Sequence, residues 1–259
     1  MNTTMQEKKD AFERLLNIMD ELREKCPWDK KQTFESLRSL TVEETYELGE
    51  GILKRDLTEI KKELGDILLH IVFYARLGNE EKAFDITDVI NSLNEKLIYR
   101  HPHVFGTTEV ADDTEVKKNW EHLKIKEGNR TVLGGVPGTL PALIKASRIQ
   151  EKVRAVGFDW DERSQVWDKV KEEIEEVEVE IKNANSEKTE QEFGDLLFSV
   201  VNACRLYEVD PETALERTNQ KFIKRFNYLE QKTIDSGRSL KEMTLAEMDK
   251  IWEEAKKLK

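Results

Sequence analysis

Residues 63–77 read ELGDILLHIVFYARL, and this stretch decides the fold. Its apolar residues follow one another at steps of three or four positions, from Leu64 through Ile67 to Ile71, which is the spacing of one face of an α-helix. Residues 192–206, EFGDLLFSVVNACRL, align with it without gaps, and seven of the fifteen positions are identical. Both stretches therefore predict a helix with one apolar face, and their likeness indicates an internal repeat.

Acidic and aromatic motifs recur around both helices in the same order. EETYE at residues 43–47 corresponds to EEIEE at 172–176, and in each copy sixteen positions separate the last Glu of this motif from the first Glu of the following helix. The other corresponding segments are Trp28-Asp29 with Trp160-Asp161, and NEKLIYR at 94–100 with NQKFIKR at 219–225. The chain therefore contains two copies of one helical module.

The composition favours helices throughout the chain. Only 12 Gly and 5 Pro stand among 259 residues, and no convincing strand alternation is present. We predict an all-α protein with one helical module at 1–128, a linker at 129–141 and a second module at 142–259. The linker prediction rests on the Gly and Pro residues of GNRTVLGGVPGTLP at 128–141. A phosphate-binding loop is the alternative for this segment, but the Gly-Lys-Ser/Thr ending of a P-loop is missing.

The excess of acidic over basic residues makes some classes of function unfavourable. The chain has 53 acidic and 42 basic residues, a formal net charge of −11 at pH 7, which disfavours binding to nucleic-acid polymers. An anionic substrate would need metal ions to mediate its approach. We see neither an apolar signal segment near the N-terminus nor a run of about 18 apolar residues for a membrane span. Two widely separated cysteines, Cys26 and Cys204, fit a reducing compartment, so we expect a cytoplasmic protein without membrane contact.

Acidic pairs share one face of each predicted helix. Glu44 and Glu47 are three positions apart, as are Glu63 and Asp66 on the following helix. A short connection should turn the two helices antiparallel, so that the four carboxylates converge. The second copy repeats the set with Glu173, Glu176, Glu192 and Asp195. Four carboxylates repel one another unless cations lie among them, and hard oxygen ligands in this number favour Mg²⁺ or Mn²⁺.

The acidic residues have two other interpretations, a solvated helix face and a metal site for oxygen chemistry. A single Glu-x-x-Glu pair in so charged a chain is usually a solvated helix face, but both pairs recur at the same separation in both halves. A di-iron or di-manganese site for oxygen chemistry uses Glu-x-x-His pairs. None of the histidines has a Glu three positions before it; they are His70, His101, His103 and His122. Covalent catalysis has no candidate, because no Cys-His or Ser-His-Asp arrangement is evident.

Taken together, the ordered motifs resemble those of a known family. Glu-Glu-x-x-Glu followed by Glu-x-x-Asp in a helical module is the signature of the all-alpha nucleoside triphosphate pyrophosphohydrolases. KCPWD at 25–29, YRHPHVFG at 99–106 and GFDW at 157–160 are similar to segments of the family's tandem-repeat members. The resemblance covers nearly the whole chain, and the ordered set is more specific than the acidic motif alone.

This resemblance implies hydrolysis of a nucleoside triphosphate to the monophosphate and pyrophosphate, with Mg²⁺ as cofactor; Mn²⁺ is the second ion that the carboxylate ligands would accept. It also implies a homodimer in which helices of two subunits form four-helix bundles. The C-terminal half would be the main catalytic unit, with metal ligands Glu173, Glu176, Glu192 and Asp195. The first-half equivalents are Glu44, Glu47, Glu63 and Asp66. The residues that match nucleotide contacts of the family are Lys221, Arg225, Trp252 and Lys256.

Several assignments stay open at this point. A glutamate with a carboxylate oxygen that does not bind metal can accept a proton from the attacking water. Glu172 and Glu173 are the candidates. Trp252 either stacks on a base or anchors the last helix. A metal-dependent nucleotide-binding module without turnover and a purely structural helical dimer are the alternatives to an enzyme. The sequence does not decide the base and sugar preference, nor whether the N-terminal half is active.

Overall fold

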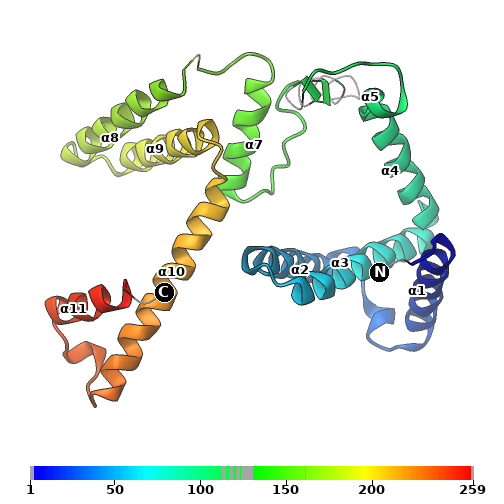
Figure 1. Ribbon diagram of the computed structural model, residues 1–259, viewed down its shortest axis with the longest axis horizontal. Helices are drawn as coiled ribbons and strands as arrows, with labels where there is room; N and C mark the ends of the chain where they lie inside the picture. Colours follow the sequence, from blue (N-terminus) through cyan, green and yellow to red (C-terminus); the bar gives the residue numbers. More distant parts are fainter. Residues whose placement is uncertain are drawn as a thin grey trace. The chain divides into compact units, whose positions relative to one another are not determined.

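The computed structural model describes residues 3–112, 115–116, 119–120, 123, 131–160 and 162–257 (Figure 1). Over these residues all regular elements are helices, which confirms the predicted all-α class. The chain divides into two compact units, Met1–Val110 and Ala111–Lys259. The module bounds drawn from the sequence, 1–128, 129–141 and 142–259, stay a prediction, and residues 124–130 lie outside the described part of the chain.

The N-terminal unit is built around a hairpin of two long helices. Its elements are α1 (Met5–Lys25), the 3₁₀ helix η1 (Asp29–Lys31), α2 (Phe34–Lys54), α3 (Leu57–Glu80), α4 (Ile86–Arg100) and α5 (Pro102–Phe105). α2 and α3 lie side by side as the hairpin (Figure 1). Met19 of α1, Leu37 of α2, and Val72 and Phe73 of α3 form the buried core. The core therefore fixes α1 against the hairpin.

The C-terminal unit contains a second hairpin, formed by α8 and α9 (Figure 1). Its elements are α7 (Ala142–Arg154), η2 (Arg163–Gln165), α8 (Val166–Lys182), α9 (Ser186–Leu206), α10 (Pro211–Asp235), η3 (Leu240–Glu242) and α11 (Leu245–Ala255). Val166 and Val170 of α8 and Ala203 of α9 form its buried core. α7 packs on α9, and α11 packs on α10. Each of the two units thus contains a hairpin of two long helices.

Equivalent turns close the two hairpins. Arg55 after α2 and Ala184 after α8 adopt left-handed φ values of 54° and 55°, which end the helices. The next residues, Asp56 and Asn185, cap α3 and α9. Their side-chain oxygens accept hydrogen bonds from backbone N–H groups of the first turn at 2.9 and 3.2 Å. Because the turns match, each hairpin brings its two acidic pairs to facing sides.

Large apolar side chains on both hairpins remain exposed. On α3 the predicted apolar face is only partly covered, because Val72 is buried whereas Leu64 is 53% exposed and Ile71 43%. On α9, Phe193 and Leu197 are also exposed. Exposed apolar patches of this kind mark interaction surfaces. None of the helices in the described ranges has the length and apolar character that a membrane span requires.

Candidate metal centres

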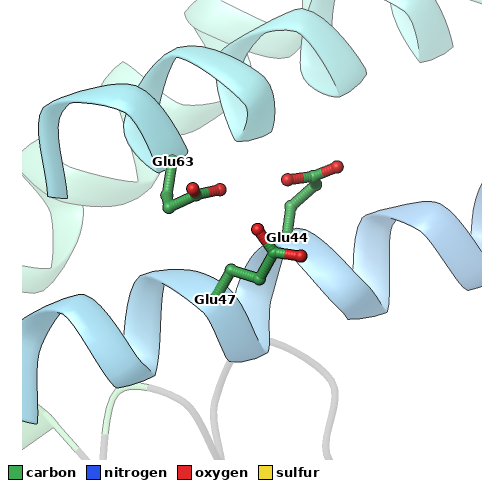
Figure 2. Close-up of side chains that lie close together, drawn as sticks. All are labelled: Glu44, Glu47 and Glu63. Atoms are coloured by element: carbon green, nitrogen blue, oxygen red, sulfur yellow. The ribbon is translucent and has the colours of Figure 1, made fainter. Parts of the chain in front are cut away.

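Three glutamates converge in the α2–α3 hairpin. Glu44 and Glu47 extend from successive turns of α2, and Glu63 extends from α3 toward them (Figure 2). One carboxylate oxygen of each residue lies within 4.8 Å of the other two. Helical periodicity predicted that these three side chains lie on facing sides of two helices. The structure brings them together.

Glu63 is the buried member of this N-terminal cluster. Its side chain is 0% exposed, and Lys62 Nζ donates a hydrogen bond to its Oε1 at 2.7 Å. The other oxygen, Oε2, accepts no hydrogen bond from the described residues. The hydrogen bond from Lys62 lowers the pKa of Glu63 and outweighs the effect of burial. An ionised, buried oxygen without a donor is unfavourable unless a cation or a water satisfies it.

Repulsion between the carboxylates is visible at Glu44. Burial raises the pKa of Glu44, and the neighbouring carboxylates of Glu63, Asp66 and Glu47 add to the effect. The negative charges of the cluster therefore oppose one another at Glu44. A divalent cation would relieve the same repulsion without protonation.

The α8–α9 hairpin repeats this arrangement. Glu173 and Glu176 of α8 and Glu192 of α9 each place one oxygen within 4.8 Å of the other two. Glu173 is 4% exposed, and its Oε2 accepts no hydrogen bond within the described ranges. Burial raises the pKa of Glu176, and the charges of Glu173 and Glu192 raise it further. The C-terminal cluster thus has the same ligand types, a buried member and the same repulsion.

A lysine contacts each cluster, which the sequence reasoning missed. Lys169 Nζ lies 2.7 Å from Glu173 Oε1 and 2.9 Å from Glu172 Oε1. These contacts raise the pKa of Lys169, mainly through the hydrogen bond to Glu173, and Lys62 is affected likewise by Glu63. The four-residue step from Lys169 to Glu173 was a visible signal, because residues at that spacing pair on a helix.

The fourth predicted ligand lies at the margin of each cluster. Asp66 is half-buried one turn after Glu63, and its charge contributes to the raised pKa of Glu44. Asp195 is exposed on α9, one turn after Glu192. Neither aspartate belongs to the groups of three converging oxygens. Their role as ligands stays a prediction.

Two of the residues expected to contact the nucleotide line one cavity. Lys221 and Arg225 lie one turn apart on α10, and they surround a cavity of about 300 Å³ together with Lys224, Tyr228 and Ala255 of α11. Cationic side chains on one helix face can hold the oxygens of a phosphate chain. The cavity is therefore compatible with the predicted phosphate contacts, which remain a prediction.

The other two expected contacts lie on and just after α11. The ring of Trp252 packs at a tilt against Phe222 of α10, with 4.9 Å between the ring centroids. Lys256 Nζ lies 2.5 Å from Glu253 Oε1. Trp252 therefore anchors α11 to α10, which is one of the two roles that the sequence left open. Nucleotide contact by Trp252 and Lys256 stays a prediction.

The donor sets fit a hard divalent cation. Each consists of carboxylate oxygens, the ligands that Mg²⁺ and Mn²⁺ prefer. Each also contains one buried oxygen that lacks a donor among the described residues, on Glu63 and on Glu173. A cation among these oxygens would satisfy them, offset the repulsion and present positive charge to phosphate oxygens.

Comparisons with known proteins point to one family. The sequence model of the MazG nucleotide pyrophosphohydrolase domain matches residues 32–105 and 162–229, which include both clusters. The chain is 44% identical, over 97% of its length, to the nucleoside triphosphate pyrophosphohydrolase/pyrophosphatase MazG of Thermotoga maritima and covers 98% of that protein. It is 40% identical, over 96% of its length, to the nucleoside triphosphate pyrophosphohydrolase of Escherichia coli and covers 98% of it. The uncharacterized protein YabN of Bacillus subtilis is 45% identical over 95% of this chain, which covers 51% of that protein.

Proposed function

We propose that this chain, which belongs to the MazG nucleotide pyrophosphohydrolase family, hydrolyses nucleoside triphosphates to nucleoside monophosphates and pyrophosphate with Mg²⁺. One observation carries the proposal. In each segment that the family model matches, three glutamates converge, and one of them has a buried oxygen without a donor among the described residues. That arrangement suits a cation that in turn binds phosphate oxygens.

The C-terminal cluster is the proposed main catalytic centre. Glu173, Glu176 and Glu192 would hold the ion there, with Asp195 as the fourth ligand. The bound ion, for which Mn²⁺ can substitute, neutralises phosphate charge and makes nearby water more acidic. The N-terminal set of Glu44, Glu47, Glu63 and Asp66 offers a second centre of the same composition.

Glu172 suits the role of proton acceptor better than Glu173. Glu172 is exposed on α8 beside the cluster, so it can reach a water molecule. Glu173 is buried, with Oε1 on Lys169 and with Oε2 buried and without a donor among the described residues. Lys169 contacts both glutamates and so orients them. Lys221 and Arg225 on α10 supply further positive charge for the phosphate chain.

A homodimer is the proposed assembly. The α2–α3 and α8–α9 hairpins each expose large apolar side chains, among them Leu64 and Leu197. If a hairpin of one copy of the chain packs against a hairpin of a second copy, the two would cover these faces. Their four helices would then form a four-helix bundle. The uncovered apolar area supports this assembly, because association is driven by removal of apolar surface from water.

Pyrophosphate release from a panel of nucleoside triphosphates tests the proposal. Wild type, Glu176→Gln and Glu47→Gln are each assayed with Mg²⁺, with Mn²⁺ and with EDTA. Glu178→Gln is the matched control, because Glu178 is an exposed glutamate on α8 that pairs only with Lys182 among the described contacts. We expect metal-dependent release of monophosphate and pyrophosphate that Glu176→Gln reduces by about 100-fold or more and that Glu178→Gln preserves.

The outcomes separate the two halves and the alternative function. Full activity in Glu176→Gln together with loss in Glu47→Gln would move the chemistry to the N-terminal cluster. Metal-dependent nucleotide binding without pyrophosphate from any nucleotide would replace the enzyme by a regulatory binding module.

A further inference from the structure

The ammonium group of Lys62 lies among the carboxylates of the N-terminal cluster. Its Nζ lies 2.7 Å from Glu63 Oε1, 3.1 Å from Glu59 Oε1 and 3.9 Å from Glu47 Oε2. Glu63 and Glu47 belong to the cluster and come from different helices, α3 and α2. A positive charge of the chain itself therefore joins two of the three glutamates that would hold a divalent cation.

Lys169 contacts the C-terminal cluster in a different way. It pairs with Glu172 and Glu173, and both of these lie on its own helix, α8. Its ion pairs within the described part of the chain include no other member of that cluster. A lysine is thus paired with one glutamate of the C-terminal cluster, whereas Lys62 is paired with two of the N-terminal cluster.

The two lysines are not equivalent in the repeat. Gln191 of α9 occupies the position of Lys62, and Leu40 of α2 occupies that of Lys169. A glutamine side chain carries no charge, so the C-terminal cluster has no ammonium group at the place from which Lys62 contacts two glutamates. The two halves therefore differ at a residue that bears directly on cation binding.

A divalent cation and the Lys62 ammonium group would compete for the same oxygens. Both need the carboxylates of Glu47 and Glu63, and two positive charges at neighbouring positions repel each other. Glu63 is buried, so water and salt screen this repulsion less than they do at an exposed site. Entry of a cation would therefore require that the hydrogen bond from Lys62 to Glu63 is broken.

The Lys62 side chain can withdraw from the cluster. It is 58% exposed, and a lysine has a flexible four-carbon stem. Glu59 lies one turn earlier on α3, outside the cluster, and would keep its ion pair with Lys62 after the withdrawal. Glu63 Oε2 has no donor among the described residues even with Lys62 in place. The cluster thus still attracts a cation, and Lys62 weakens cation binding without preventing it.

We propose that the Lys62 ammonium group competes with the divalent cation in the N-terminal cluster, so that this cluster binds the cation more weakly than the C-terminal cluster does. The inference rests on the proposed function, because that function places a cation at both clusters. At limiting cation concentration the C-terminal cluster fills first. Lys62 meanwhile offsets part of the negative charge of the N-terminal cluster.

Mn²⁺ binding to the full-length chain without nucleotide tests the proposal, with free Mn²⁺ measured by electron paramagnetic resonance. Glu176→Lys removes a ligand and adds a positive charge, so this variant reports on the N-terminal cluster alone; Glu47→Lys likewise reports on the C-terminal cluster. We expect the Kd in Glu176→Lys to be about tenfold higher than in Glu47→Lys. Adding Lys62→Gln to Glu176→Lys should lower its Kd about tenfold, because one charge-assisted hydrogen bond no longer has to be broken.

Two further variants separate competition from a general effect of charge or fold. Lys62→Arg, added to Glu176→Lys, keeps the positive charge and should leave the Kd unchanged. Lys54→Gln is the matched control, because Lys54 is an exposed lysine of the same hairpin that pairs with Glu50, outside the cluster; it should leave the Kd unchanged too. Melting temperatures in EDTA establish that each variant is folded, and Mn²⁺ should raise the melting temperature more in Lys62→Gln than in wild type.

The outcomes distinguish this inference from the proposed reaction. Equal Kd values for the two clusters, or a Kd that Lys62→Gln leaves unchanged or raises, would overturn the inference, because Lys62 would then only support the hairpin. Mn²⁺ binding to neither cluster would overturn it together with the metal centres. If both clusters bind Mn²⁺ with the expected difference but no nucleotide yields pyrophosphate, the proposed reaction fails and the competition by Lys62 stands.

Discussion

Replacing Asp159 by Asn should measure how firmly the segment 157–160 is fastened to α9. The Asp159–Arg205 pair has two hydrogen bonds, and its side chains are only 18% and 9% exposed. Removal of one partner from a buried ion pair costs about 3–5 kcal/mol. Arg205 keeps its hydrogen bond to Asn202, so we expect a loss at the lower end, about 3 kcal/mol in the free energy of unfolding of the C-terminal unit.

Urea unfolding followed by circular dichroism and tryptophan fluorescence measures this loss. The control is Asp168→Asn, because Asp168 is exposed and pairs with Lys171 at 3.3 Å; its effect should stay below about 0.5 kcal/mol. The double variant Asp159→Leu/Arg205→Met should recover most of the stability, since no unpaired buried charge remains. A loss below about 1 kcal/mol in Asp159→Asn, as for a surface pair, would refute the reasoning.

In the N-terminal unit, acid should weaken the contact between α1 and α3. The hydrogen bond from Arg23 lowers the pKa of Glu80, so its stabilisation is present above the unfolded pKa and is lost as the pH falls through the lower folded value. Urea midpoints below about pH 5 should therefore fall less steeply in Glu80→Gln than in wild type, and parallel curves would contradict this. Gly78→Ala should lower the melting temperature, with a loss of about 1–3 kcal/mol, because a Cβ there would lie 2.6 Å from the ring of Phe84; an unchanged melting curve would disprove the clash. Leu197→Glu places a charge on the exposed apolar face of α9. Light scattering should then report a monomer with unchanged helix content, whereas a dimer would argue against assembly through this face.

The sequence by itself determined the helices, the repeat and the composition of both clusters. Leu64, Ile67 and Ile71 indicated a helix because local spacing alone decides which residues share a face. Glu44 and Glu63 could be expected to converge because two amphipathic helices with a short connection pack as a hairpin. The recurrence of the motif after an equal interval made a chance pattern improbable. Family membership followed from the same local motifs, which lie in the segments that the family model matches.

Only the tertiary structure decided which side chains of different helices contact one another. Gln150 contacts Phe198 forty-eight residues away, and Asp159 contacts Arg205 forty-six residues away. No periodicity encodes such pairs, because they depend on how the helices of the folded unit lie against one another. The same holds for the ring of Trp252 against α10 and for the buried oxygens without donors. Local spacing sets which side chains leave a helix on the same face, whereas packing between distant segments sets which of them enclose a cavity.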